Sequence, residues 1–144
     1  MIDLEPSNQT KLFGLDSHLL ELIRLYKSNN YPNKLLLSGS KGIGKSTLAY
    51  HLINYVLSEE EDHKYDIKNF EINTESKTFK TILNKSNMNL ITIDVNPDKK
   101  SIDITQIRGL IINLNKSSFN DKPRFVLIDN IELLNVNSIN ALLK

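Results

Sequence analysis

A glycine-rich segment at residues 39–47 has the residue types and spacing that bind a nucleoside triphosphate. Its members are Gly39, Ser40, Lys41, Gly42, Ile43, Gly44, Lys45, Ser46 and Thr47, which fit the P-loop pattern. The glycines let the backbone curl until its N–H groups face the phosphate oxygens. A lysine at this place contacts the β- and γ-phosphates, and the serine hydroxyl binds Mg²⁺. We therefore expect ATP and Mg²⁺ as cofactors.

A carboxylate at Asp129 is the second candidate for the metal site. It closes the apolar run Arg124-Phe125-Val126-Leu127-Ile128. In P-loop nucleotidases such a carboxylate holds Mg²⁺ directly or through water. Taken alone, an aspartate after a strand is more often a turn residue. Together with the glycine-rich segment, the pattern predicts Ser46 and Asp129 as the Mg²⁺ ligands.

The residue that would activate water for hydrolysis is missing from its usual place. ATPases of this type commonly carry a glutamate directly after the strand-end aspartate, and here that residue is Asn130. An amide can orient a water molecule but cannot accept its proton. Glu132 is a weak candidate for a substitute base, and a solvated or capping role suits it better. The catalytic residue is thus unknown, and we expect ATP binding with weak or no hydrolysis.

Hydrophobic periodicity indicates helices that alternate with strands around these residues. The expected helices begin at Ser17, span 45–58 and about 76–84, run from 104 to near 116, and begin again near 135 or 137. The expected strands are 34–38, 90–95 and 124–129. This order predicts a parallel sheet covered on both faces, with ligands beyond the carboxyl ends of its strands. The glycine-rich segment and Asp129 would meet at that edge.

Composition sets the broad class of protein. The 144 residues are 40% hydrophobic and 24% charged, with a formal net charge of +1 and no cysteine. We expect one globular domain in the cytoplasm with no membrane segment, because no apolar run approaches the length of a membrane span. The three histidines lack metal-ligand spacing, and the acidic run at 59–62 is expected to be a solvated loop. The last residues read as a helix in progress, so we expect a fragment of a longer chain.

Several of these segments resemble one family. They are Phe13-Gly14-Leu15-Asp16, the glycine-rich segment continued to Ala49, Ile104-Thr105-Gln106-Ile107-Arg108, and Ile128-Asp129-Asn130-Ile131-Glu132-Leu133-Leu134-Asn135 with Asn140-Ala141-Leu142-Leu143-Lys144. Together they resemble the AAA+ clamp-loader subunits of bacterial DNA polymerase III. The resemblance covers most of the chain and is weakest at residues 59–88.

The resemblance implies a fold, partners and further site residues. The fold would be a three-layer α/β P-loop NTPase of the AAA+ type with a mainly parallel sheet. Residues 1–144 would be its incomplete N-terminal part, without the lid and collar domains. The partners would be other clamp-loader subunits (gamma/tau and delta) and, through the complex, the sliding clamp and primer-template DNA, with no membrane contact. Phe13 and Gly14 would lie beside the adenine, although a core position and a turn suit them equally well. For Arg108, a surface charge suits the sequence better than a contact with phosphate.

Three functions stay open at this level. Asn130 and the absence of a four-cysteine zinc module make the chain more similar to the delta-prime subunit than to gamma/tau. One alternative is a catalytically active P-loop ATPase of gamma/tau or helicase-loader type, with Glu132 or a neighbouring subunit supplying the base. The other is a P-loop small-molecule kinase, which would need an acceptor pocket and a lid.

Overall fold

The computed structural model describes residues 3–143. The chain forms two compact units, one up to Asn87 and the other from Met88 onward. The first unit is helical and contains the glycine-rich segment. The second is an α/β unit and contains Asp129. Each unit is described by itself below.

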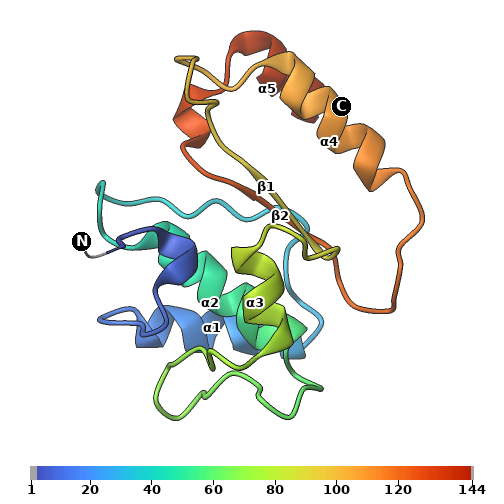
Figure 1. The fold of residues 1–144 in the computed structure, drawn as a ribbon. Helices are drawn as coiled ribbons and strands as arrows, with labels where there is room; N and C mark the ends of the chain where they lie inside the picture. The colour runs from blue at the N-terminus through green and yellow to red at the C-terminus, as the bar shows by residue number, and fades with distance from the viewer. Residues whose placement is uncertain (1–2, 144) are drawn as a thin grey trace. The chain divides into compact units, whose positions relative to one another are not determined.

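The helix that follows the glycine-rich segment is the core of the first unit. The elements of this unit are η1 (Pro6–Asn8), α1 (Asp16–Lys27), α2 (Lys45–Leu57) and α3 (Lys77–Leu83). Helix α2 packs against the other three, and Figure 1 shows it between α1 and α3. Its sequence is apolar on most sides. Residues on several sides of the helix are therefore buried, Leu48, Leu52 and Leu57 among them.

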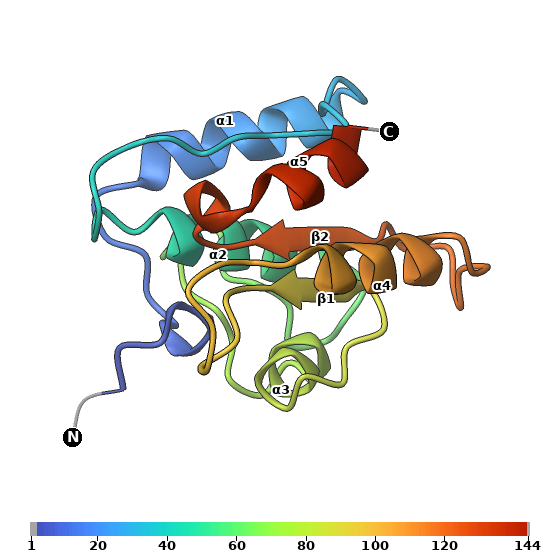
Figure 2. The same ribbon diagram turned by 90° about the horizontal axis from the view of Figure 1, so that it is seen from above.

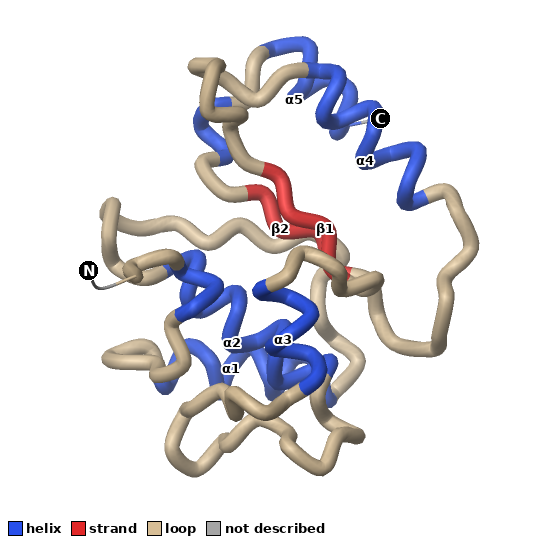
Figure 3. Tube along the Cα trace, viewed as in Figure 1, coloured by secondary structure: helices blue, strands red, loops and turns tan. Residues whose placement is uncertain are grey.

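The strand expected at 34–38 is not present, and this prediction was wrong. Residues 35–40 lie in an extended loop without strand pairing, part of the long connection between α1 and α2 (Figure 3). Leu35 and Leu36 are 43% and 68% exposed. An apolar run predicts burial, but a strand also needs a neighbouring backbone to accept and donate its hydrogen bonds. The two strands of the described range 3–143 pair with each other instead.

The acidic run at 59–62 is only partly solvated. The Glu61 carboxylate accepts hydrogen bonds from the Ser76 hydroxyl at 2.7 Å and from the Thr78 N–H at 3.0 Å, so it caps the N-terminus of α3. Partial burial opposes its ionisation, but the hydrogen bonds from Thr78, Ser76 and Lys77 outweigh this and lower the pKa of Glu61. Glu59 pairs with Lys27 at 3.2 Å. The run therefore ties a loop to both α1 and α3.

The second unit is built on a parallel pair of strands. Its elements are β1 (Leu90–Ile93), α4 (Ile104–Leu114), β2 (Phe125–Ile128), η2 (Ile131–Leu133) and α5 (Val136–Leu143). The register pairs Leu90 with Phe125 and Ile93 with Ile128, and Figure 2 shows the two strands running side by side. The connection through α4 is the crossover that a parallel pair requires.

The core of the second unit lies between this sheet and the helices α4 and α5. Ile93, Ile102, Ile107 and Leu110 are buried in it. Alternate strand residues, Ile91 and Val126 among them, pack against the same cluster together with Ala141 and Leu142 of α5. One face of the sheet is thus covered by these two helices, as the period of two along a strand requires. The α/β class and the parallel pairing are confirmed, and a three-layer arrangement stays a prediction.

The remaining elements agree with the sequence predictions to within a few residues. The expected final helix is α5, although Lys144 lies outside the described residues. None of the helices in the described part of the chain is long and apolar enough to cross a membrane.

Candidate functional site

The glycine-rich loop, defined as residues 39–47, turns sharply before it enters α2. Gly42 and Gly44 adopt positive φ values of 82° and 97°, which side chains with a Cβ rarely tolerate. The Ile43 N–H donates to the Ser40 carbonyl at 3.3 Å, which closes the turn. Gly44 is the N-cap of α2, and the helix proper begins at Lys45. The loop therefore leads directly into a helix N-terminus, where unpaired N–H groups favour an anion.

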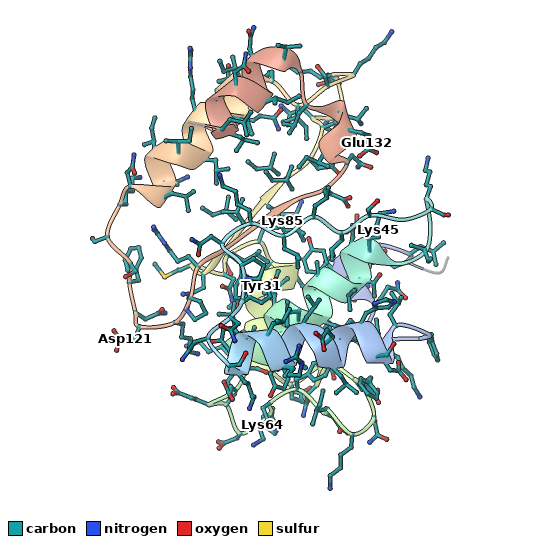
Figure 4. All side chains as sticks on the ribbon, turned by 180° about the vertical axis from the view of Figure 1, so that it is seen from behind. Tyr31, Lys45, Lys64, Lys85, Asp121 and Glu132 are labelled. Atoms are coloured by element: carbon teal, nitrogen blue, oxygen red, sulfur yellow. The ribbon has the colours of Figure 1, made fainter. Side chains whose placement is uncertain are left out.

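The side chain of Lys45 folds back over this loop. Its ammonium donates to the Gly39 carbonyl at 2.8 Å and to the Ser40 carbonyl at 2.9 Å. Figure 4 labels Lys45 at the first turn of α2. Ser46 and Thr47 follow in the same turn and are half-buried. The ammonium of Lys45 thus lies against the first two residues of the loop, and Ser46 is the next residue of the helix.

The segment with Phe13 and Gly14 reaches the same loop through its next residue. A Cβ placed on Gly44 would lie 3.2 Å from Leu15 Cδ1, so Leu15 packs closely against the end of the loop. Gly14 has a positive φ of 72°, in agreement with a turn residue. Phe13 is 77% exposed, which excludes the core position that the sequence left open for it. The Lys11 ammonium lies 5.9 Å from the centre of the Phe13 ring.

A buried histidine ties α2 to the chain that precedes this segment. His51 Nε2 lies 2.9 Å from the Gln9 carbonyl, and Nδ1 lies 2.7 Å from the Tyr65 hydroxyl. A carbonyl can only accept, so Nε2 carries the proton and Nδ1 accepts from Tyr65 when the ring is neutral. Burial lowers the pKa of His51, and the bond to Gln9 opposes that shift only in part. Burial likewise raises the pKa of Tyr65. Both groups are therefore neutral near pH 7.

In the second unit, Asp129 and Asn130 follow β2 directly. The Asp129 N–H donates to the Ile93 carbonyl at 2.9 Å, which continues the parallel pairing by one residue. The Asp129 carboxylate accepts from the Asn130 N–H at 2.9 Å. The Asn130 side-chain amide donates to the carboxylate of Asp94 at 2.9 Å. Asp94 follows β1, so both strands end in an aspartate at the same edge of the sheet.

Sequence reasoning missed the role of Asp94. Its carboxylate also accepts from the Val95 N–H at 2.7 Å, and its carbonyl accepts from the Gln106 side chain at 2.8 Å. Gln106 belongs to a capping box with Asp103 at the start of α4. A signal was present, because Ile93-Asp94 repeats the strand-end pattern of Ile128-Asp129. Only the register of the two strands, however, shows that these positions are neighbours.

Other predicted positions do not join this cluster. Glu132 is exposed in η2, two residues beyond Asn130, and Figure 4 labels it on the segment after β2. Arg108 is exposed on α4, in agreement with a surface charge. The glycine-rich loop belongs to the first unit and Asp129 to the second. Their meeting at one Mg²⁺ ion therefore stays a prediction.

Comparison with known proteins identifies the family. No curated protein gives a significant match to the chain. A family model described as "DNA polymerase III, delta subunit" matches residues 15–144, which include the glycine-rich loop, Asp94, Asp129 and Asn130. The match supports a clamp-loader-type role in DNA polymerase III and in DNA replication. The chain belongs to the DNA polymerase III delta subunit family.

Proposed function

We propose that the chain is a delta-prime-like clamp-loader subunit that binds Mg²⁺-ATP through the glycine-rich loop and hydrolyses it weakly or not at all. Nucleotide would be held by the loop N–H groups and by Lys45. Ser46 and Asp129 would hold the metal ion. Bound Mg²⁺ would neutralise phosphate charge, as it does in other nucleotide sites.

The position of the Lys45 side chain is the observation that most supports nucleotide binding. Its ammonium is held by two loop carbonyls, at 2.8 and 2.9 Å, at the entrance to a helix whose N-cap is a left-handed glycine. These residues fit a triphosphate because the backbone donors and the cation belong to one short loop. Leu15 packed against Gly44 places the segment of Phe13 next to this loop, which supports its contact with the base.

The amide at position 130 supports weak hydrolysis and the delta-prime assignment. It follows the strand-end carboxylate directly, and its NH₂ group donates to Asp94. An amide is too weak a base to take a proton from the attacking water. In the assembled complex the subunit would work with gamma/tau and delta subunits on the sliding clamp at primer-template DNA. That role would place it in the cytoplasm.

A steady-state ATPase assay tests this function against an active P-loop ATPase. We expect the chain to turn ATP over at a rate roughly 10²- to 10⁴-fold below that of an enzyme with a positioned base. Because Glu132 is exposed and outside the Asn130 cluster, the Glu132→Ala variant should behave like the parent chain. Appreciable turnover that Glu132→Ala abolishes would contradict the proposal and favour the gamma/tau or helicase-loader type.

A further inference from the structure

The buried side chain of His51 connects α2 to the Phe13 segment, defined as residues 9–15. We infer that His51 is a positioning residue for the base-binding side of the nucleotide site, through its hydrogen bond to the Gln9 carbonyl. The part of this inference that concerns nucleotide rests on the proposed function, in which Phe13 contacts the base. The hydrogen bond itself is a property of the chain alone.

The Phe13 segment contacts α2 at two places. At the start of the helix, a Cβ on Gly44 would lie 3.2 Å from Leu15 Cδ1. Further along, His51 Nε2 donates to the Gln9 carbonyl at 2.9 Å. Gly44 and His51 are seven residues apart, about two helical turns, so they lie on the same face of α2. The segment is therefore attached to that face at both of its ends, and Phe13 lies between the two attachments in the chain.

Backbone pairing stiffens the Phe13 segment between these attachments. The Leu12 N–H donates to the Phe70 carbonyl at 3.0 Å, and the Ile72 N–H donates to the Thr10 carbonyl at 2.8 Å. This pairing keeps the segment extended, so a restraint on one of its residues also restrains the others. The bond from His51 therefore acts on the segment as a whole.

Position 51 needs a donor and an acceptor in one buried side chain. The Gln9 carbonyl accepts from Nε2, and the Tyr65 hydroxyl, 2.7 Å from Nδ1, supplies the other hydrogen. The imidazole is completely buried, so water does not replace a missing partner and an unpaired ring nitrogen is costly. With both nitrogens paired, the ring has one orientation, which fixes where the Gln9 carbonyl lies.

The position of the Phe13 segment concerns the nucleoside rather than the phosphates. The bonds of the Lys45 ammonium, to the Gly39 and Ser40 carbonyls, lie within the glycine-rich loop and do not involve this segment. Loss of the bond from His51 should therefore weaken the binding of ATP. It should not weaken the binding of inorganic triphosphate, which has no base.

The test compares the affinities of the complete chain for Mg²⁺-ATP and for Mg²⁺ with inorganic triphosphate, by calorimetry and by displacement of ATP. The shorter amide of His51→Asn does not reach the Gln9 carbonyl, whereas the amide nitrogen of His51→Gln can replace Nε2. We expect His51→Asn to weaken ATP binding at least about fivefold, on the scale of one base stacked on an aromatic ring, and to leave triphosphate binding unchanged. His51→Gln should restore the parent's ratio. Tyr65→Phe is the matched control, because it costs stability but leaves the bond to Gln9 in place.

Hydrogen exchange without nucleotide tests the attachment by itself. Relative to the amides of α2, we expect the Leu12 and Ile72 N–H groups to exchange at least about fivefold faster in His51→Asn than in Tyr65→Phe, on the scale of one lost hydrogen bond. In the parent chain, NMR of the ring nitrogens of His51 should find the proton on Nε2. This last measurement still decides if His51→Asn does not fold.

Equal relative exchange in His51→Asn and Tyr65→Phe would overturn the inference, as would a neutral parent ring with its proton on Nδ1. A parallel loss of ATP and triphosphate affinity in His51→Asn would also overturn it, because that result indicates a general loss of structure. So would unchanged ATP affinity. Absence of ATP uptake by the parent chain contradicts the proposed function instead, and the exchange measurement then decides whether His51 holds the segment.

Discussion

Replacing Ile107 with alanine is expected to lower the free energy of unfolding by about 2–5 kcal/mol. Ile107 is fully buried on α4 and packs in the cluster with Ile93 and Ile102. The substitution removes three carbons from a fully buried site and leaves a cavity in the core. Urea denaturation followed by circular dichroism measures the change, and hydrogen exchange at the β1 and β2 amides shows whether the strand ends open with it.

Ile112→Ala is the matched control on the same helix. Ile112 is 63% exposed, so its truncation should change the free energy of unfolding by less than about 0.5 kcal/mol. If both variants lose the same amount, or neither loses any, the second unit is not held by the core described above.

The His51→Ala variant is expected to lose about 2–4 kcal/mol of stability at pH 7.5. The imidazole is completely buried, and it joins Tyr65 to the Gln9 carbonyl. Its removal leaves a cavity and a buried Tyr65 hydroxyl without its acceptor. Thermal and urea unfolding measure the loss, with His18→Ala as control because His18 is exposed on α1.

The same histidine predicts a pH dependence of stability. Burial lowers the pKa of His51 in the folded state below its ordinary value of 6.5, so the unfolded chain binds the proton first. The contribution is complete above pH 6.5 and is lost as pH falls below it, towards the folded pKa. In the interval below pH 6.5 and above the folded pKa, the free energy of unfolding should fall with decreasing pH by at most about 1.4 kcal/mol per pH unit, and His51→Ala should lack this slope. An unchanged slope in the variant would contradict the neutral buried ring.

Sequence periodicity predicted the helices well because each amphipathic pattern is local. The helix expected at 45–58 is α2, and the strand expected at 90–95 is β1, which ends two residues earlier. The run at 34–38 failed for a different reason. Its leucines have the composition of a buried strand, but pairing depends on a partner far away in the chain, and composition carries no information about that partner.

In the candidate site, too, local features could be predicted from the sequence and contacts between distant residues could not. The glycine-rich loop was predictable, because the phosphate pattern and its helix are contiguous in sequence. The bridge from Asp94 to Asn130 was not, because it joins residues 36 apart through the register of two strands. The cap that Glu61 gives α3 was missed likewise, since an acidic run reads as solvent-exposed unless the distant donors Ser76 and Thr78 are known.

Calorimetric titration of Mg²⁺-ATP into the complete folded chain tests the central claim most directly. We expect saturable uptake that the Lys45→Ala variant weakens at least about tenfold, the scale of a lost charge-assisted hydrogen bond. Lys64→Ala, which removes an exposed charge of the same unit, should leave the affinity unchanged. Absence of uptake by the parent chain, or equal uptake by Lys45→Ala, would contradict nucleotide binding at the glycine-rich loop.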